Sequence, residues 1–298
     1  MSSAVRNFYP IRKAFRLSPL VMALALISPF HANAAEQSEK IEQSEQIATQ
    51  THRFHRDHIL GTSLDVVVQG ASKQDARRAV DAIEKEISQL DQVLSTWRND
   101  SEITALNNNK QANVSAELFE VIAACETWRD KTCGAFDARL GQLITLWEQS
   151  QGVVKLDEAT RAQVLNQLQS DSVELDAEQR SIAIDSAVKF APDAYAKGYI
   201  IDRALVAARQ AVPSIEGLLV DIGGDIRVWG NAPQKEGWKI GVQDAFVHND
   251  NSAPQQVLNL NDQAIAFSGQ GYRTLAGQSH LLDPKTGMPL QQVEQCVV

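Results

Sequence analysis

The segment Ser279–Gly287 combines residues that could move a proton while a phosphate ester is cleaved or formed. His280 titrates near neutral pH, so its ring can give or take a proton. Asp283 can orient this histidine or face a metal ion, and Pro284 and Gly287 are typical of a turn that fixes the loop. The same residues also suit a loop in which His280 and Asp283 only form hydrogen bonds, because so short a motif is weak on its own.

Two consecutive glycines, Gly223 and Gly224, interrupt an apolar run between Val220 and Ile226. Glycines weaken a strand, so their presence indicates a bend or a close approach of the backbone to another group. In one interpretation a flat ring or a phosphate lies against the chain, with Asp225 beside the ligand. In the other the glycines form a β-bulge, and the segment alone favours neither.

A lysine in the first turn of a predicted helix is a further candidate for binding. Lys197 lies in the run Ala196–Tyr199, close to where the helix is expected to start. There it could meet a phosphate, helped by the free backbone amides of a helix N-terminus. The alternative is a lysine that is simply exposed to solvent.

Two turns carry the remaining candidates. Thr132–Asp137 is a tight turn that leads into a helix, with Asp137 as its expected N-cap. In the second turn, Leu94–Glu102, the ring of Trp97 offers a flat face for an isoalloxazine or adenine ring, and Ser101 or Asp100 could cap the next turn of the chain. A tryptophan in the core is the alternative interpretation of Trp97.

Helices and strands neither alternate strictly nor separate into two blocks along the chain. Helical periodicity is found over 74–94, 116–130, 137–149, 158–167 and 194–212. Strands are expected at 64–68, 173–175, 182–184, 217–229 (broken by the two glycines), 238–243, 258–260 and 264–268. This order predicts a mixed α/β (α+β) fold with a largely antiparallel sheet and flanking helices, formed as a single domain over 54–298.

The N-terminal residues read as a secretory signal. The first 34 residues carry four cations and no acid, then an apolar run over 17–30, and they end in Ala32-Asn33-Ala34, a small-x-small cleavage site. We therefore predict a signal peptide over 1–34, with an uncleaved N-terminal anchor as the alternative. Residues 35–53 repeat Glu-Gln-Ser-Glu without apolar periodicity, which predicts a disordered tether.

The net charge of −9 restricts the partners. Cleavage of the basic leader would make the mature chain more acidic still, so its surface should repel nucleic acid and anionic lipid. We expect no nucleic-acid partner and no strong membrane insertion after cleavage. Any nucleotide site must supply positive potential locally, from amides, a lysine or a metal.

The three cysteines cannot all pair within one chain. Cys125 and Cys133 could form a disulfide in an oxidising compartment. The alternative is a buried thiol at Cys125 and a loop thiol at Cys133. The spacing with Cys296 does not suggest zinc.

Read in order, six segments resemble the ApbE family of FAD:protein FMN transferases over roughly residues 54–290. They are Gly61-Thr62, Ser95–Glu102, Gly134–Asp137, Ala196–Tyr199, Asp221–Asp225 and Ser279–Gly287. The resemblance implies a protein outside the cytoplasmic membrane, in the periplasm, that binds FAD and magnesium. It also implies transfer of FMN onto a threonine hydroxyl of an acceptor flavoprotein subunit of the respiratory or electron-transfer type, with release of AMP.

The resemblance also implies roles for individual residues. His280 would be the general base or proton shuttle, and Asp283 would support it or lie near the metal. Trp97, Ala135, Phe136 and Asp137 would contact FAD. Lys197 would approach its phosphates, and Leu281 would lie against the flavin or adenosine. The backbone carbonyl of Ala194 falls at the position of a magnesium ligand.

Three departures from the family pattern bear on activity. Ala191 stands where an acidic residue is usual, and Cys133 where an aspartate is usual. The later Ala-Asp-x-x-x-Thr segment, which supplies the side-chain magnesium ligands, would lie beyond Val298, so the domain is expected to be C-terminally incomplete. FAD hydrolysis to FMN and AMP and non-catalytic periplasmic flavin binding are therefore the alternative functions.

Overall fold

The computed structural model describes residues 50–150, 156–234, 236–242, 253–269, 274–275, 278–290 and 295–297. The predicted leader and residues 35–49 of the predicted tether lie outside these ranges. Strand β1 (Thr51–Ile59) begins at Thr51, so the last three residues of the predicted tether belong to a strand. Within the same ranges, no helix combines the length and the apolar character needed to cross a bilayer.

The central element is a five-stranded antiparallel sheet in the order β1-β2-β6-β7-β10. Besides β1, its strands are β2 (Thr62–Gln69), β6 (Gly217–Ile222), β7 (Asp225–Gly230) and β10 (Ala264–Ile265). This confirms the predicted mixed α/β class with an antiparallel sheet. The prediction of one broken strand over 217–229 is wrong, because β6 and β7 are separate strands that pair as a hairpin, with Ile222 opposite Asp225.

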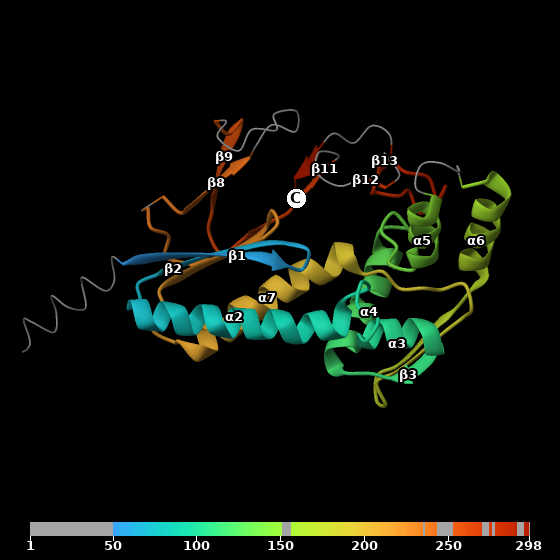
Figure 1. Ribbon diagram of the computed structural model, residues 1–298, viewed down its shortest axis with the longest axis horizontal. Helices are drawn as coiled ribbons and strands as arrows, with labels where there is room; N and C mark the ends of the chain where they lie inside the picture. Colours follow the sequence, from blue (N-terminus) through green and yellow to red (C-terminus); the bar gives the residue numbers. More distant parts are fainter. Residues whose placement is uncertain are drawn as a thin grey trace, which may run out of the picture. The chain divides into compact units, whose positions relative to one another are not determined.

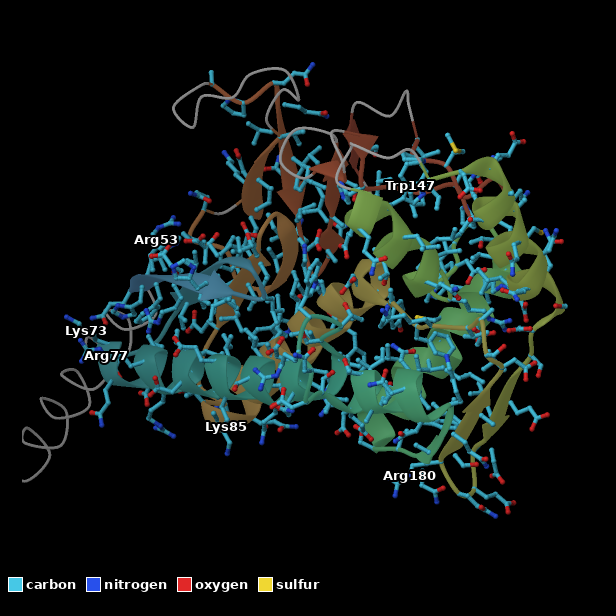
Figure 2. All side chains as sticks on the ribbon, turned by 45° about the vertical axis from the view of Figure 1, so that its right-hand side comes forward. Arg53, Lys73, Arg77, Lys85, Trp147 and Arg180 are labelled. Carbon is cyan, nitrogen blue, oxygen red and sulfur yellow. The ribbon has the colours of Figure 1, made fainter. Side chains whose placement is uncertain are left out.

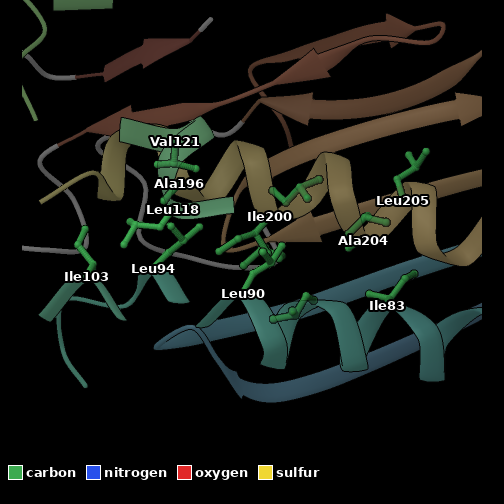
Figure 3. Close-up of a cluster of buried hydrophobic side chains, with 14 of the residues drawn as sticks. Ile83, Leu90, Leu94, Ile103, Leu118, Val121, Ala196, Ile200, Ala204 and Leu205 are labelled. Atoms are coloured by element: carbon green, nitrogen blue, oxygen red, sulfur yellow. The ribbon is translucent and has the colours of Figure 1, made fainter. Parts of the chain in front are cut away.

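Two long helices, α2 (Lys73–Leu94) and α7 (Asp193–Ala211), pack against each other and supply the main core (Figure 1). Helix α2 begins at the N-cap Ser72, whose hydroxyl accepts a hydrogen bond from the amide of Asp75. Apolar residues recur along α2 at helical spacing, so one stripe is buried. Figure 3 shows this stripe (Ile83, Leu90, Leu94) beside Ile200 and Ala204 of α7.

The other face of the sheet is covered by the pair β8 (Trp238–Val242) and β9 (Gln256–Leu260). Trp238 and Leu260 from this pair contact Val67 and Val228 of the sheet in a second, smaller apolar cluster. Because residues alternate along each strand, the sheet can bury apolar side chains on both faces. The domain therefore has helices, sheet and a strand pair in successive layers.

Side chains of α7 and β7 meet in three contacts along their length. They are Lys197 Nζ to Asp225 Oδ2 at 3.1 Å, Asp202 Oδ1 to Arg227 Nε at 3.3 Å, and the Arg209 guanidinium 3.9 Å from the Trp229 ring centroid. The three β7 residues alternate along the strand, so they share one face. We refer to these contacts as the α7–β7 ladder; they tie the helix to the sheet at both ends and in the middle.

Of the remaining described elements, α3 (Glu102–Asn109) and α4 (Ala116–Lys131) contact α2. The others are α5 (Gly141–Ser150), α6 (Glu158–Ser170), β3 (Gln111–Asn113), β4 (Val173–Asp176), β5 (Ser181–Ile184), β11 (Phe267–Gly269), β12 (Thr274–Leu275), β13 (Gln278–Ser279) and β14 (Gln295–Val297). Strands β4 and β5 pair about the predicted turn at 176–180. Helix α5 starts at Gly141, four residues later than predicted.

Candidate active site

The turn between β6 and β7 is the two-residue loop Gly223–Gly224. Both glycines have positive φ, 60° and 93°, which defines a type I′ turn and explains why glycine occupies both positions. The carboxylate of Asp221 accepts a hydrogen bond from the amide of Gly224 at 2.8 Å. A Cβ on Gly223 would lie 2.6 Å from side-chain atoms of Thr62. The glycines thus form a hairpin turn rather than a bulge.

Lys197 and Asp225, both predicted site residues, are brought together. They form the first contact of the α7–β7 ladder, with 34% and 21% of their side chains exposed. The pair joins the first turns of α7 to the Gly-Gly turn. Because Asp225 partly neutralises Lys197, a phosphate that binds here would have to share the ammonium group with this carboxylate.

A row of ionisable residues crosses the sheet beside this turn. Asp65 of β2 lies opposite Asp221 of β6, and His55 of β1 lies opposite Asp65. Burial raises the pKa of Asp221, and the neighbouring carboxylates of Asp65 and Asp225 raise it further. His55 Nδ1 is 2.8 Å from Asp65 Oδ1, and this hydrogen bond raises the pKa of the histidine. Sequence reasoning did not find this row, which depends on the strand register.

The loop with Ala135, Phe136 and Asp137 is fastened to α4. Consecutive amides from 132 to 135 donate to α4 or loop carbonyls, and the amide of Phe136 donates to the hydroxyl of Thr132 at 3.0 Å. Asp137 accepts from Arg129 Nε at 3.0 Å and from the amide of Arg139 at 2.8 Å. The expectation that Asp137 caps the next helix is wrong, because both carboxylate oxygens hold the loop. Ala135 is exposed, and Phe136 is partly buried.

A buried ion pair fastens the end of the same loop. Arg139 is 7% exposed and donates through Nε to Glu126 of α4 at 2.9 Å, with a second bond through Nη2. Its Nη1 donates to the carbonyl of Asp171 at 3.2 Å. Arg129 and Arg139 therefore both hold the loop. The sequence pattern did not indicate either contact.

The segment that leads into α7 is joined to this loop. Ala191 donates through its amide to the carbonyl of Ala138 at 2.7 Å, and the carbonyl of Lys189 accepts from Gly141 at 2.9 Å. Buried Asn107 holds the backbone of Phe190 at both its amide and its carbonyl, at 2.7 and 2.9 Å. Hydrogen bonds therefore connect the Ala135–Asp137 loop, which the sequence predicts to contact FAD, with the segment that leads into α7.

The described residues do not fit a complete magnesium site. Ala194 is exposed in the first turn of α7, where a carbonyl is directed along the helix toward the amide four residues on. Across the described ranges, no group of three or more His, Cys, Asp or Glu side chains is placed to hold a metal ion. Magnesium requires near-octahedral oxygen ligands, and one helical carbonyl supplies too few.

The loop with His280, Leu281 and Asp283 is a closed turn. Asp283 accepts from the amide of Lys285 and the hydroxyl of Thr286, each at 2.9 Å, so both of its carboxylate oxygens fix the turn. His280 and Leu281 are partly buried, and the amide of Leu281 donates to the Ser279 hydroxyl at 3.1 Å. The hydrogen-bonding role that the sequence offered for Asp283 is confirmed, while support of His280 stays a prediction.

Trp97 lies on another segment, between α2 and α3, and its side chain is 65% exposed. The core interpretation of this residue is therefore wrong. Ser101 caps α3 as the sequence suggested, since its hydroxyl accepts from the amide of Thr104. Cys125 is buried and Cys133 is exposed, and both are free thiols, so the disulfide is not formed. Burial raises the pKa of Cys125 to about 12. The side chain of Cys296 lies outside the described set.

Together, the antiparallel sheet, its two covering helices and these loops define a mixed α/β domain in which the Gly-Gly turn contacts the first turns of α7 and the Ala135–Asp137 loop is joined to the segment that leads into α7. The chain belongs to the ApbE family, whose model matches residues 60–298.

Similar proteins from other organisms agree with this assignment. A Haemophilus influenzae protein named FAD:protein FMN transferase is 27% identical over 239 residues, covering 74% of this chain and 66% of that protein. A Vibrio cholerae protein of the same name is 28% identical over 250 residues, covering 78% and 71%. This chain thus spans about two thirds of the length of these relatives.

Solved structures show the same fold. The ApbE protein from Thermotoga maritima superposes with a TM-score of 0.70 at 27% identity, covering 83% of this chain and 81% of that one. The flavin transferase ApbE from Vibrio cholerae gives 0.67 at 22% identity with the same coverage.

Proposed function

We propose that this chain is a FAD:protein FMN transferase, which moves FMN from FAD onto a threonine hydroxyl of a target protein and releases AMP. One observation carries the proposal. The match to the ApbE family runs through residues 60–298 and so includes the Gly-Gly turn, Lys197 and the His280 loop. Relatives matched over most of this length bear the transferase name.

The proposed reaction breaks one bond and forms one. The threonine oxygen attacks the phosphorus of the FMN half, the pyrophosphate P–O bond breaks, and AMP leaves with the bridging oxygen. His280 takes the proton from the attacking hydroxyl, as suits a group that titrates near neutral pH. Lys197, shared with Asp225, offers positive charge to the phosphates.

The ring systems of FAD would be held by the surrounding loops. Trp97 has an exposed face for stacking, and Ala135 and Phe136 lie on the loop fastened to α4. Leu281 would pack on the flavin or adenosine. Asp137 contributes by holding this loop, since its carboxylate is already bonded on both oxygens.

Magnesium dependence also belongs to the proposal. A magnesium ion held at the site would supply positive charge to offset that of the pyrophosphate and the leaving phosphate. The Ala194 carbonyl is the proposed ligand from this chain, although the described residues do not complete the site. EDTA should abolish turnover, and added magnesium should restore it.

We further propose export to the periplasm and an acceptor that is a flavoprotein subunit of an electron-transfer system. The basic leader with its apolar run supports export. N-terminal sequencing of the protein from a periplasmic extract would find Ala35 as the first residue; an intact leader in the membrane fraction would contradict export.

The transferase proposal is tested by intact-mass analysis of a threonine-containing acceptor domain mixed with the protein, FAD and magnesium. A gain of one FMN group on the acceptor supports it. Release of FMN and AMP without a mass gain would indicate FAD hydrolysis, and FAD binding without turnover would indicate a flavin-binding protein. His280→Ala should abolish steady-state transfer, leave only a slow residual reaction that single-turnover measurements detect, and retain FAD binding. His52→Ala, at the far end of β1, is the matched control and should retain both.

A further inference from the structure

The tip of the His280 loop is attached to two helices far away in the sequence. Trp147 of α5 is 4% exposed, and its indole Nε1 donates to the carbonyl of Gly287 at 2.9 Å. Arg161 of α6 donates through Nη1 to the carbonyl of Thr286. Figure 1 shows both helices beside the C-terminal part of the chain, and Figure 2 labels Trp147 there.

The packing at this point leaves little freedom. Gly287 is buried with a φ of 65°, and a Cβ there would lie 3.3 Å from Arg161 and 3.4 Å from both Leu143 and Leu165. A side chain at position 287 would therefore press against α5 and α6, and the glycine leaves room for the loop to approach both helices. A carbonyl buried at such a contact needs its donor, because an unsatisfied buried acceptor is unfavourable.

Backbone hydrogen bonds carry this attachment back toward His280. The amide of Gly287 donates to the carbonyl of Asp283 at 2.7 Å, and the amide of Asp283 donates to the carbonyl of Met288 at 2.8 Å. At the base of the loop, the amide of Leu290 donates to the carbonyl of Leu281 at 2.8 Å. The loop is thus braced from its tip to the residue directly after His280.

We propose that Trp147 and Arg161 are positioning residues for the reaction, acting through the braced loop to hold the His280 ring in the orientation that proton transfer requires. The proposal rests on the proposed function. It does not need either side chain to touch FAD or the acceptor. Small displacements of a proton-transfer group lower the rate steeply, so loosening the tip should slow the chemical step while leaving FAD binding in place.

The chain offers a matched control for the indole donor. Trp238 is 3% exposed, and its Nε1 also donates to a glycine carbonyl, that of Gly230, at 3.2 Å. Trp147→Phe and Trp238→Phe each keep an aromatic ring and remove one buried indole donor. Their effects on global stability should be similar, but only Trp147 is connected to the His280 loop. The control for Arg161→Met is Arg180→Met. Arg180 lies in the β4–β5 turn, away from the His280 loop (Figure 2).

Two measurements test the proposal on the full-length protein. Hydrogen exchange of the amides in 281–290 reports the brace directly and needs no turnover. Single-turnover FMN transfer with saturating FAD reports the chemical step, and it is repeated in a His280→Ala background. A purely structural Trp147 would lower activity by the same factor with or without His280.

We expect Trp147→Phe and Arg161→Met to speed exchange in 281–290 and slow transfer about tenfold or more, with the Kd for FAD within about twofold of wild type. In the His280→Ala background they should add little further loss. The control variants should leave both quantities unchanged. Unchanged exchange, an unchanged rate, or full additivity with His280→Ala would each overturn the proposal. A wild-type protein without turnover would refute the transferase function instead, and exchange alone would then decide whether the brace exists.

Discussion

Replacing Arg139 by methionine tests how strongly the buried ion pair holds the Ala135–Asp137 loop. The change removes two bonds to Glu126, which is itself 17% exposed, and one to the carbonyl of Asp171. Removing one partner of a buried pair strands the other charge, which typically lowers the free energy of unfolding by about 3–5 kcal/mol. Because Glu126 retains some contact with water, we expect about 3 kcal/mol, the lower end of that range.

Urea and thermal unfolding measure this change. For a domain of this size, about 3 kcal/mol corresponds to a Tm lowered by roughly 6–12 °C. The double variant Glu126→Leu/Arg139→Met replaces both charges by apolar groups and should regain most of the loss, to within about 1–2 kcal/mol of wild type. Arg77→Met, on the exposed side of α2, is the control and should change stability by less than about 0.5 kcal/mol. A loss below about 1 kcal/mol for Arg139→Met, or a double variant as unstable as the single one, would refute the reasoning.

Three further changes test the local geometry. Gly198→Ala should raise the free energy of unfolding by about 1 kcal/mol in urea, because the position is inside α7 and an added Cβ meets no atom within 4 Å; a destabilised variant would contradict this. Asp221→Asn should stabilise the domain at pH 7 by a few tenths to about 1 kcal/mol. Because the pKa of Asp221 is raised in the folded state, the free energy of unfolding of the wild type falls as pH rises through this pKa. Below pH 3.8 the carboxyl is protonated in both states, so the wild type and the variant should be equally stable there. An equal gain at all pH values would disprove a charge effect. Cys133→Gly should gain up to about 1 kcal/mol in urea, because Cys133 has a φ of 52°, and a loss would show that the thiol packs usefully.

The long helices and the apolar strands could be predicted from the sequence because their periodicity is strong. Helix α2 was expected over 74–94 and is found at Lys73–Leu94, while α7 differs from its expected bounds by one residue at each end. Strand β1 could not be found this way. It is an outer strand in which exposed and half-buried positions alternate, but His52 and Arg56 occupy two of the half-buried positions, so the sequence shows no alternation of apolar residues. Helix α3 was missed since it is only eight residues long and mostly polar.

The site was predictable in its motifs and less so in its contacts. The Gly-Gly pair between apolar runs is a hairpin signal, and reading it as a type I′ turn would have separated β6 from β7. The carboxylates of Asp137 and Asp283 look available in the sequence, yet each is engaged by nearby donors in its own loop or in α4. Such local bonding is common for aspartate, and sequence spacing does not distinguish it from binding a ligand.

The α7–β7 ladder also limits how the helix can slide over the sheet. Its contacts alternate in sign along the helix, with a cation at 197, an anion at 202 and a cation at 209. If α7 slid so that each of its residues met the preceding β7 partner, Asp202 would face Asp225 and Arg209 would face Arg227, which would replace both ion pairs by contacts between like charges. Only one translational setting of α7 satisfies all three contacts. The height of Lys197 above the Gly-Gly turn is therefore determined by residues up to 12 positions away along the same helix.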